Sequence, residues 1–242
     1  MKYLLTFFTL SICFFAFSQS KVKDSSASCI ANWKKGEEKV LYIIHNKENY
    51  EFDTLKSRIN FSYEAHVSIL DSNSTGYTVQ WIFHLPEAIM QTNPNLADSL
   101  PVFEGMKMVF KTSGTGSFIE LINWKEVKDA YIKMMEFSLP KNPDSTAKAV
   151  LNQTKALFNS KEMVEASLIK EIQLFHLPYG YKFTTKRTIA KTELANPFAN
   201  EPLPAVQTFK ITELRPKEDY FKLVVRQVID KASAMKMFEG IF

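Results

Sequence analysis

The clearest pattern in the chain is an alternation of apolar and polar residues between Ile59 and Ile69. Apolar side chains stand at every second position, and polar side chains fill the gaps: Ile59, Phe61, Tyr63, Ala65, Val67 and Ile69. Successive side chains of a strand point to opposite faces of its sheet, so this period of two predicts a long, half-buried strand.

A second alternating segment follows at once. The sequence DSNSTG, residues 71–76, is rich in turn-forming residues, and Tyr77, Val79, Trp81 and Phe83 alternate behind it. The two segments predict an antiparallel hairpin with one aromatic face. Shorter strand patterns are expected at three further places, Lys39–His45, Met106–Phe110 and Phe118–Ile122.

Between residues 123 and 176 the apolar spacing becomes helical. Asn123 and Glu126 have the spacing of a capping box, and the helix behind them is expected to run to about Leu139. A second helix is predicted to start at Asn142–Asp144, and a third at Asn159. Strand patterns then return over residues 181–192, 206–214 and 221–229, with a Pro-rich loop at 196–204 and a short helix after Asp230.

Strands over 38–122, helices over 123–176 and strands over 181–229 predict an α+β fold. Runs of strands followed by a run of helices favour a mainly antiparallel sheet, with a central run of two to three helices packed on one face. Residues 86–101 are expected to form an irregular connection. We expect residues 20–242 to make a single domain.

The first nineteen residues predict a secretory signal peptide. Lys2 precedes an apolar run from Tyr3 to Phe17, which is short for a membrane span, and the polar residues Ser18 and Gln19 follow. We expect cleavage near Gln19, export to the periplasm or the outer membrane, and no transmembrane segment afterwards. Of the two cysteines, Cys29 then remains without a partner for an internal disulfide and reads as an incidental thiol.

Charge and motifs argue against several function classes. The 30 basic and 26 acidic residues are spread without basic runs, so no nucleic-acid partner is expected. Residues 111–118, KTSGTGSF, contain two of only seven glycines but lack the third glycine, the Lys-Ser/Thr pair and the following helix of a phosphate loop. We interpret them as a hairpin turn whose glycines supply positive φ.

No metal or cofactor site is predicted. The four histidines are scattered, without the spacing of a zinc motif. His66 and His84 lie on the polar faces of neighbouring predicted strands, so the register decides whether they meet in a two-histidine site or are ordinary surface residues. A serine triad or a carboxylate pair dispersed along the chain leaves no pattern to recognise.

The remaining candidate site is aromatic. Tyr63, Trp81 and Phe83 line one face of the predicted hairpin, and a helix carrying Tyr131 and Met134 is available to cover them. These residues either form an ordinary core or line a cleft for an apolar ligand, lipid or partner polypeptide. The leading hypothesis is therefore a non-enzymatic exported binding protein. An envelope assembly factor that uses a sheet edge and a hydrolase with a dispersed site are the alternatives.

The signal exit, the sequences WKKG and GYTVQW, and the run TSGTGSFIELINWKEV resemble uncharacterised exported proteins of Bacteroidetes-type bacteria. The resemblance covers about half of the chain and concerns its layout. It implies a periplasmic or outer-membrane-facing role and assigns no catalytic residue.

Overall fold

The computed structural model describes residues 5–8, 25–51, 54–84, 105–137, 139–140, 142–194 and 202–229. Within these residues the fold is α+β and rich in antiparallel strands, as the sequence predicts. None of the described helices combines the length and the apolar character that a membrane crossing requires.

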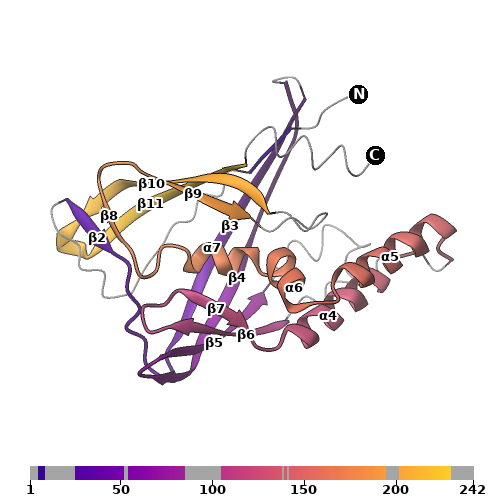
Figure 1. The fold of residues 1–242 in the computed structure, drawn as a ribbon, viewed down its shortest axis with the longest axis horizontal. Helices are drawn as coiled ribbons and strands as arrows, with labels where there is room; N and C mark the ends of the chain where they lie inside the picture. Colours follow the sequence, from indigo (N-terminus) through magenta and orange to yellow (C-terminus); the bar gives the residue numbers. More distant parts are fainter. Residues whose placement is uncertain are drawn as a thin grey trace. The chain divides into compact units, whose positions relative to one another are not determined.

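The largest sheet has six strands in the order β1-β3-β4-β5-β6-β7 (Figure 1). Their bounds are β1 (Leu5–Phe8), β3 (Glu38–Glu51), β4 (Thr54–Asn73), β5 (Gly76–His84), β6 (Lys107–Ser113) and β7 (Phe118–Leu121). The predicted hairpin is confirmed, because β4 and β5 pair antiparallel with Ala65 opposite Phe83 and Val67 opposite Trp81.

The strands predicted between residues 181 and 229 are present but do not join that sheet. Three of them form a sheet in the order β11-β10-β9. The fourth, β8, pairs with the early strand β2 in a separate two-stranded sheet. The bounds are β2 (Ser26–Ser28), β8 (Lys182–Thr184), β9 (Thr188–Leu194), β10 (Leu203–Arg215) and β11 (Tyr220–Ile229). No pattern in the sequence predicts β2.

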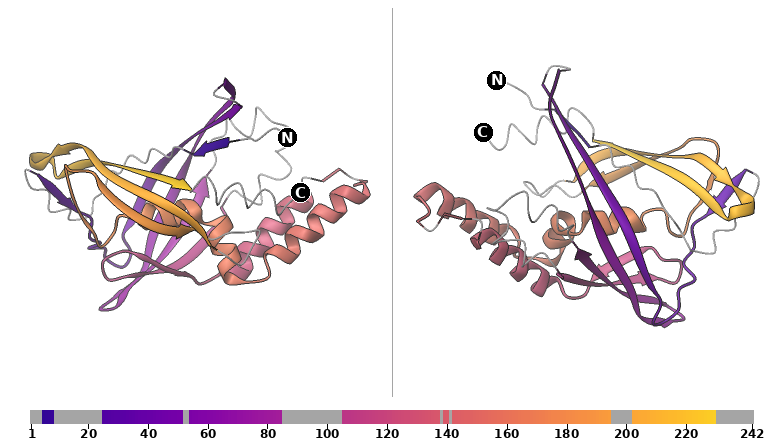
Figure 2. Two further views of the ribbon diagram at one scale, coloured as in Figure 1. Left: turned by 45° about the horizontal axis from the view of Figure 1, so that its top comes forward. Right: turned by 180° about the vertical axis from the view of Figure 1, so that it is seen from behind.

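The internal contacts divide the chain into two compact units. One comprises residues 31–42 and 63–180, and the other comprises residues 1–30, 43–62 and 181–242. Strands β3 and β4, which run side by side in both views of Figure 2, contribute to both units. This division does not test the expectation that residues 20–242 form a single domain, which stays a prediction.

The structure has four helices in its described part, where two to three were expected. They are α4 (Trp124–Phe137), α5 (Ser145–Leu157), α6 (Lys161–Leu168) and α7 (Lys170–His176). The third predicted helix is two helices, because Ile169 leaves the helical conformation at φ −119° and ψ 27°. Ile169 is fully buried at this break.

The helix starts follow local hydrogen bonds. Asp144 caps α5 by accepting a 2.7 Å bond from the Ala147 amide, at the predicted start. Ser160, rather than the predicted Asn159, caps α6. Asn123 precedes α4 as expected, but its side chain bonds to strand β6. Its Oδ1 accepts a hydrogen bond from the Val109 amide at 2.8 Å, and its Nδ2 donates to the Lys107 carbonyl at 2.9 Å.

Helix α7 lies against one face of the six-stranded sheet (Figure 1). Its Phe175 ring meets Trp81 of β5 edge-on at 5.5 Å, and its His176 ring meets Phe110 of β6 at 5.1 Å. Trp81 and Phe110 are fully buried. This layer is the core of the unit that contains residues 63–180.

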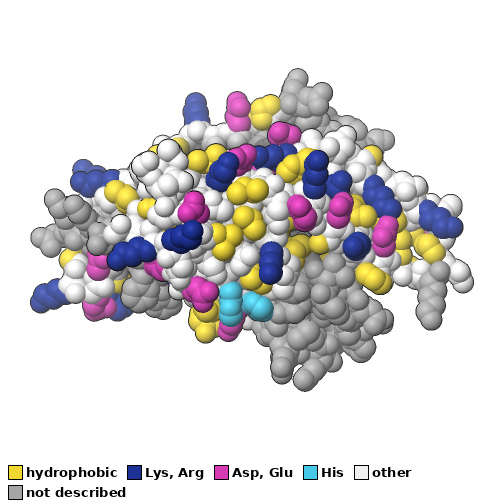
Figure 3. All heavy atoms as spheres, turned by 90° about the horizontal axis from the view of Figure 1, so that it is seen from below, with side chains coloured by type: hydrophobic (Ala, Val, Ile, Leu, Met, Phe, Trp, Pro, Cys, Tyr) yellow, Lys and Arg dark blue, Asp and Glu magenta, His cyan; other side chains and the backbone are white. Residues whose placement is uncertain are grey.

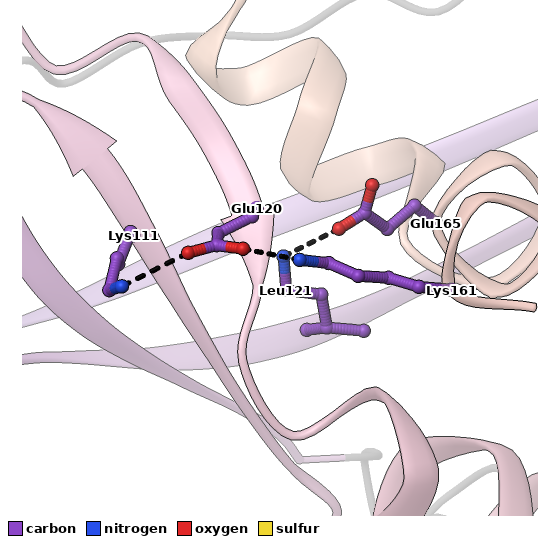
Figure 4. Close-up of polar contacts among 5 residues, drawn as sticks. All are labelled: Lys111, Glu120, Leu121, Lys161 and Glu165. Atoms are coloured by element: carbon purple, nitrogen blue, oxygen red, sulfur yellow. Dashed lines mark hydrogen bonds and ion pairs between the residues drawn. The ribbon is translucent and has the colours of Figure 1, made fainter.

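Helix α6 closes the edge of the same sheet at β7 (Figure 4). The Glu165 carboxylate accepts a 2.6 Å bond from the Leu121 amide, so a side chain takes the place of a further strand. Glu120 beside it pairs with Lys161 of α6 and with Lys111 of β6. These two ammonium groups, Lys161 foremost, hold the pKa of the Glu120 carboxyl below its usual value.

The segment KTSGTGSF is a turn between β6 and β7, as predicted. The Ser113 amide donates to the Ser117 carbonyl at 2.8 Å, and the Gly116 amide donates to the Ser113 carbonyl at 2.9 Å. Gly116 has φ +96°, whereas Gly114 does not adopt a positive φ, so the expectation for Gly114 was wrong. A Cβ atom at Gly116 would lie 2.5 Å from the Tyr179 ring and 2.8 Å from the Ala31 side chain. Gly116 is therefore required both by its backbone and by close packing.

Several predictions lie outside the described residues. They are the connection at 86–101, most of the Pro-rich loop, the helix after Asp230 and most of the signal peptide. The exception in the signal region is Leu5–Phe8, which forms β1 and pairs antiparallel with Lys47–Tyr50 of β3.

Candidate functional site

The three predicted site residues on the hairpin lie together in the core. Tyr63 on β4 and Phe83 on β5 have ring centroids 5.2 Å apart, and Trp81 lies 6.2 Å from Phe83. All three side chains are buried, and Trp81 is fully so. Burial, with a smaller contribution from the Glu171 carboxylate, raises the pKa of the Tyr63 phenol. The aromatic face of the hairpin is thus filled by side chains of the protein.

The two predicted site residues on the helix belong to a different contact. Tyr131 of α4 packs edge-on against Phe158, with ring centroids 5.3 Å apart, and Met134 lies half-buried on the same helix. α4 packs mainly on α6, α5 and β6, whereas α7 places Phe175 on Trp81. The structure thus assembles Tyr63, Trp81 and Phe83 under α7, and pairs Tyr131 with Phe158.

His176 occupies the centre of this core. Its ring is fully enclosed by aromatic neighbours, with centroids between 5.0 and 5.8 Å away: Trp33, Phe110, Phe175 and Tyr179. Nδ1 lies 2.7 Å from the Gly116 carbonyl oxygen. Since a carbonyl only accepts, Nδ1 carries the proton of a neutral imidazole. Burial lowers the pKa of His176 to about 4, and the bond to Gly116 opposes this only in part.

Two buried nitrogen atoms in this core have no hydrogen-bond partner among the described residues. They are Nε2 of His176 and Nε1 of Trp81. Both rings contact Phe175. His176 therefore acts as a structural imidazole that joins the end of α7 to the β6–β7 turn. Its side chain is 2% exposed, so it lacks the access to solvent that an acid or base catalyst needs.

Cys29 is also buried, which the polar sequence around it did not predict. Its amide donates to the Tyr181 carbonyl at 3.0 Å, directly after strand β2. Burial raises the pKa of the thiol to about 12. A buried thiol that stays protonated is a poor nucleophile and a poor metal ligand.

A surface groove lies on the three-stranded sheet of the other unit. It has a volume of about 890 Å³, and eight of the described residues, from β9, β10 and β11, line it: Lys191, Thr192, Glu193, Pro204, Ala205, Val206, Val228 and Ile229. The sequence predicts these strands but not the groove, because strand patterns do not show how three strands end together.

The strand register explains the apolar lining. Val206 of β10 lies opposite Val228 of β11 and opposite Lys191 of β9, so these three side chains form one row across the sheet. Val206 and Val228 are exposed. The groove therefore offers apolar side chains beside one ammonium group and, at Glu193, one carboxylate.

His66 and His84 meet on the opposite, polar face of the β4–β5 hairpin. Their ring centroids are 4.2 Å apart. The register permits the meeting that the sequence left open. Histidine side chains, in cyan, lie at the surface in Figure 3, where basic and acidic side chains are mixed rather than gathered by sign.

Comparison with protein-family models, with curated proteins and with solved structures found no match for this chain.

Proposed function

We propose that the protein is an exported, non-enzymatic binding protein that takes an apolar or amphipathic small molecule. The observation that carries the proposal is the groove on the β9-β10-β11 sheet. Its volume of about 890 Å³ lies within the range of small-molecule sites, and apolar side chains make up most of its lining. Export rests on the N-terminal sequence alone.

We place the ligand in the groove rather than in the layer between the six-stranded sheet and its helix, where the sequence pattern had suggested a cleft. Trp81, Phe110 and Leu121 fill that layer and are fully buried, so a ligand there would have to displace core side chains. Val206 and Val228, by contrast, are exposed without a ligand. Covering them removes apolar surface from water, which favours binding by about 25 cal/mol per Å².

The lining also indicates the chemistry of the ligand. Lys191 lies in the same row as Val206 and Val228, so an apolar chain on the two valines places its end beside the ammonium group. A fatty acid satisfies both features. Its chain covers the valines, and its carboxylate pairs with Lys191.

The test is a titration with lauric and palmitic acid, followed by calorimetry. Val206→Lys and Val228→Lys should each weaken binding at least tenfold, because each places an ammonium group where the chain lies. Val150→Lys is the matched control: Val150 lies on α5, is 51% exposed against 41% for Val206, and should leave binding unchanged. Equal affinities for all three variants would exclude the groove as the site.

An envelope assembly factor is the second candidate, and strand β3 supports it. Val40 and Tyr42 lie two residues apart, hence on one face, and are 47% and 69% exposed. A photoreactive residue at position 42 should cross-link an envelope protein in cells. The same residue at Tyr181, which is 62% exposed, is the control and should not. Identical cross-linking patterns at the two positions would count against this candidate.

A further inference from the structure

We propose that His66 and His84 form a binding site for a divalent transition-metal ion, a role separate from the groove. The register of the hairpin brings the two histidines together. Glu64 lies opposite His84, and His66 lies opposite Ile82, so the two histidines are diagonal neighbours on adjacent strands. Diagonal neighbours on one face are within reach of each other when both carry rings.

The two rings are near enough for one ion, although slightly closer together than a shared ion requires. The ring centroids lie 4.2 Å apart and the planes are inclined at 56°. Two imidazole nitrogens on one tetrahedral zinc ion are roughly 3.4 Å apart, given zinc–nitrogen bonds of about 2.0–2.1 Å. The ion lies in the plane of each ring, about 3.2 Å from its centroid, so a tetrahedral ion needs centroids about 5 Å apart. Rotation of the two partly exposed side chains by about 1 Å at the rings provides this separation.

The surroundings favour a cation. The carboxylate of Glu64 lies 3.5 Å from Nε2 of His66, and both side chains are close to half exposed. An ion can therefore enter from solvent and keep water ligands. No group of three or more His, Cys, Asp or Glu side chains in the described residues is placed to close the coordination sphere. The site is consequently an open one with two protein nitrogens, the ligand type that zinc, copper and nickel accept.

The other described imidazole and thiol do not compete for the ion. His176 is fully buried, with Nδ1 donating to the Gly116 carbonyl, and Cys29 is buried as a protonated thiol. The histidine pair joins β4 to β5, so a bound ion adds a link between two strands in the folded state alone. Binding should therefore raise the melting temperature.

The experiment uses the full chain without a histidine tag and titrates it with Zn²⁺ at pH 7.5. We expect one ion per chain, and His66→Ala and His84→Ala should each weaken binding at least tenfold. His45→Ala is the control and should stay within twofold. The two site variants should also lose the rise in melting temperature that Zn²⁺ gives the unaltered chain.

A second probe, Cu²⁺, reports the ligands directly. The electron paramagnetic resonance spectrum should show two histidine nitrogens in the unaltered chain and one in each single variant. The proposal is overturned if His66→Ala and His84→Ala bind Zn²⁺ within twofold of the unaltered chain. It is equally overturned if the Cu²⁺ spectrum of the unaltered chain shows no histidine nitrogen.

Discussion

Nδ1 of His176, at the end of α7, lies 2.7 Å from the carbonyl oxygen of Gly116, in the turn between β6 and β7. The bond joins a helix end to a turn sixty residues earlier in the chain. It holds α7 over the core. Nδ1 carries its proton in both charge states of the ring, and burial rather than this bond keeps the imidazole neutral. Each partner of this bond, His176 and Gly116, leads to one prediction.

The first prediction concerns the stability of the protein at low pH. An unfolded histidine titrates near pH 6.5, whereas burial lowers the pKa of His176 to about 4 in the folded protein. Between these values the unfolded state binds the proton and the folded state does not, so stability falls as the pH falls from about 6.5 to 4. The loss attributable to His176 is about 3 kcal/mol at pH 4, and above pH 6.5 its contribution is constant.

Urea unfolding at pH 7 and at pH 4.5 measures this effect. His176→Gln keeps a donor for Gly116 but does not titrate, so it should lose much less stability than the unaltered chain between the two pH values. His84→Gln changes a half-buried imidazole at the surface of the hairpin and serves as the control. If His176→Gln shows the same pH dependence as the unaltered chain, His176 is not the group responsible.

The second prediction separates the two glycines of the turn. Gly116→Ala should destabilise the protein by about 1–3 kcal/mol, because φ is +96° and the new Cβ would lie 2.5 Å from Tyr179. Gly114→Ala should cost less than about 1 kcal/mol, since the nearest atoms to its Cβ are 3.9 Å away. Urea midpoints compare the two variants, and similar values would contradict the role assigned to Gly116.

A third prediction concerns Glu165. Glu165→Ala leaves the Leu121 amide without its acceptor and should cost about 1–2 kcal/mol. Glu165→Gln retains an acceptor and should recover part of the loss. Hydrogen exchange at the Leu121 amide should quicken in the alanine variant and much less in the glutamine variant. Unchanged exchange in both variants would show that the edge of β7 is protected by something else.

A fourth prediction concerns export. The protein recovered from the envelope of a producing cell should begin at Ser20, and its mass should lack residues 1–19. Cleavage would also remove β1, so β3 would become the edge of the six-stranded sheet. Intact-mass measurement decides the matter. A mature chain that retains Met1 would mean that β1 belongs to the working protein.

The sequence predicted what depends on local periodicity. The alternation from Tyr63 to Ile69 and that from Tyr77 to Phe83 gave the hairpin, and turn residues placed its reversal. It did not predict that the last strands make their own sheet, because alternation identifies the faces of a strand and not its partners. The break at Ile169 was missed for a similar reason: a helical spacing of apolar residues does not show where a buried residue leaves the helical conformation.

The candidate sites show the same division. Tyr63, Trp81 and Phe83 were expected on one face and lie on one face, but only the packing of α7 shows that this face is closed. The meeting of His66 and His84 depended on a register that the residue types alone do not fix. The groove depends on how three strands end together, which no single segment encodes.

The pairing of Leu121 with Glu165 also affects how the chain is made. The Leu121 amide can form this bond only after Glu165, 44 residues later in the chain, has been synthesised. At about 5–20 residues per second, the edge of β7 remains open for roughly 2–9 s after its strand has emerged. During that interval the nascent chain carries an unpaired strand edge, which is a surface that can pair with another chain.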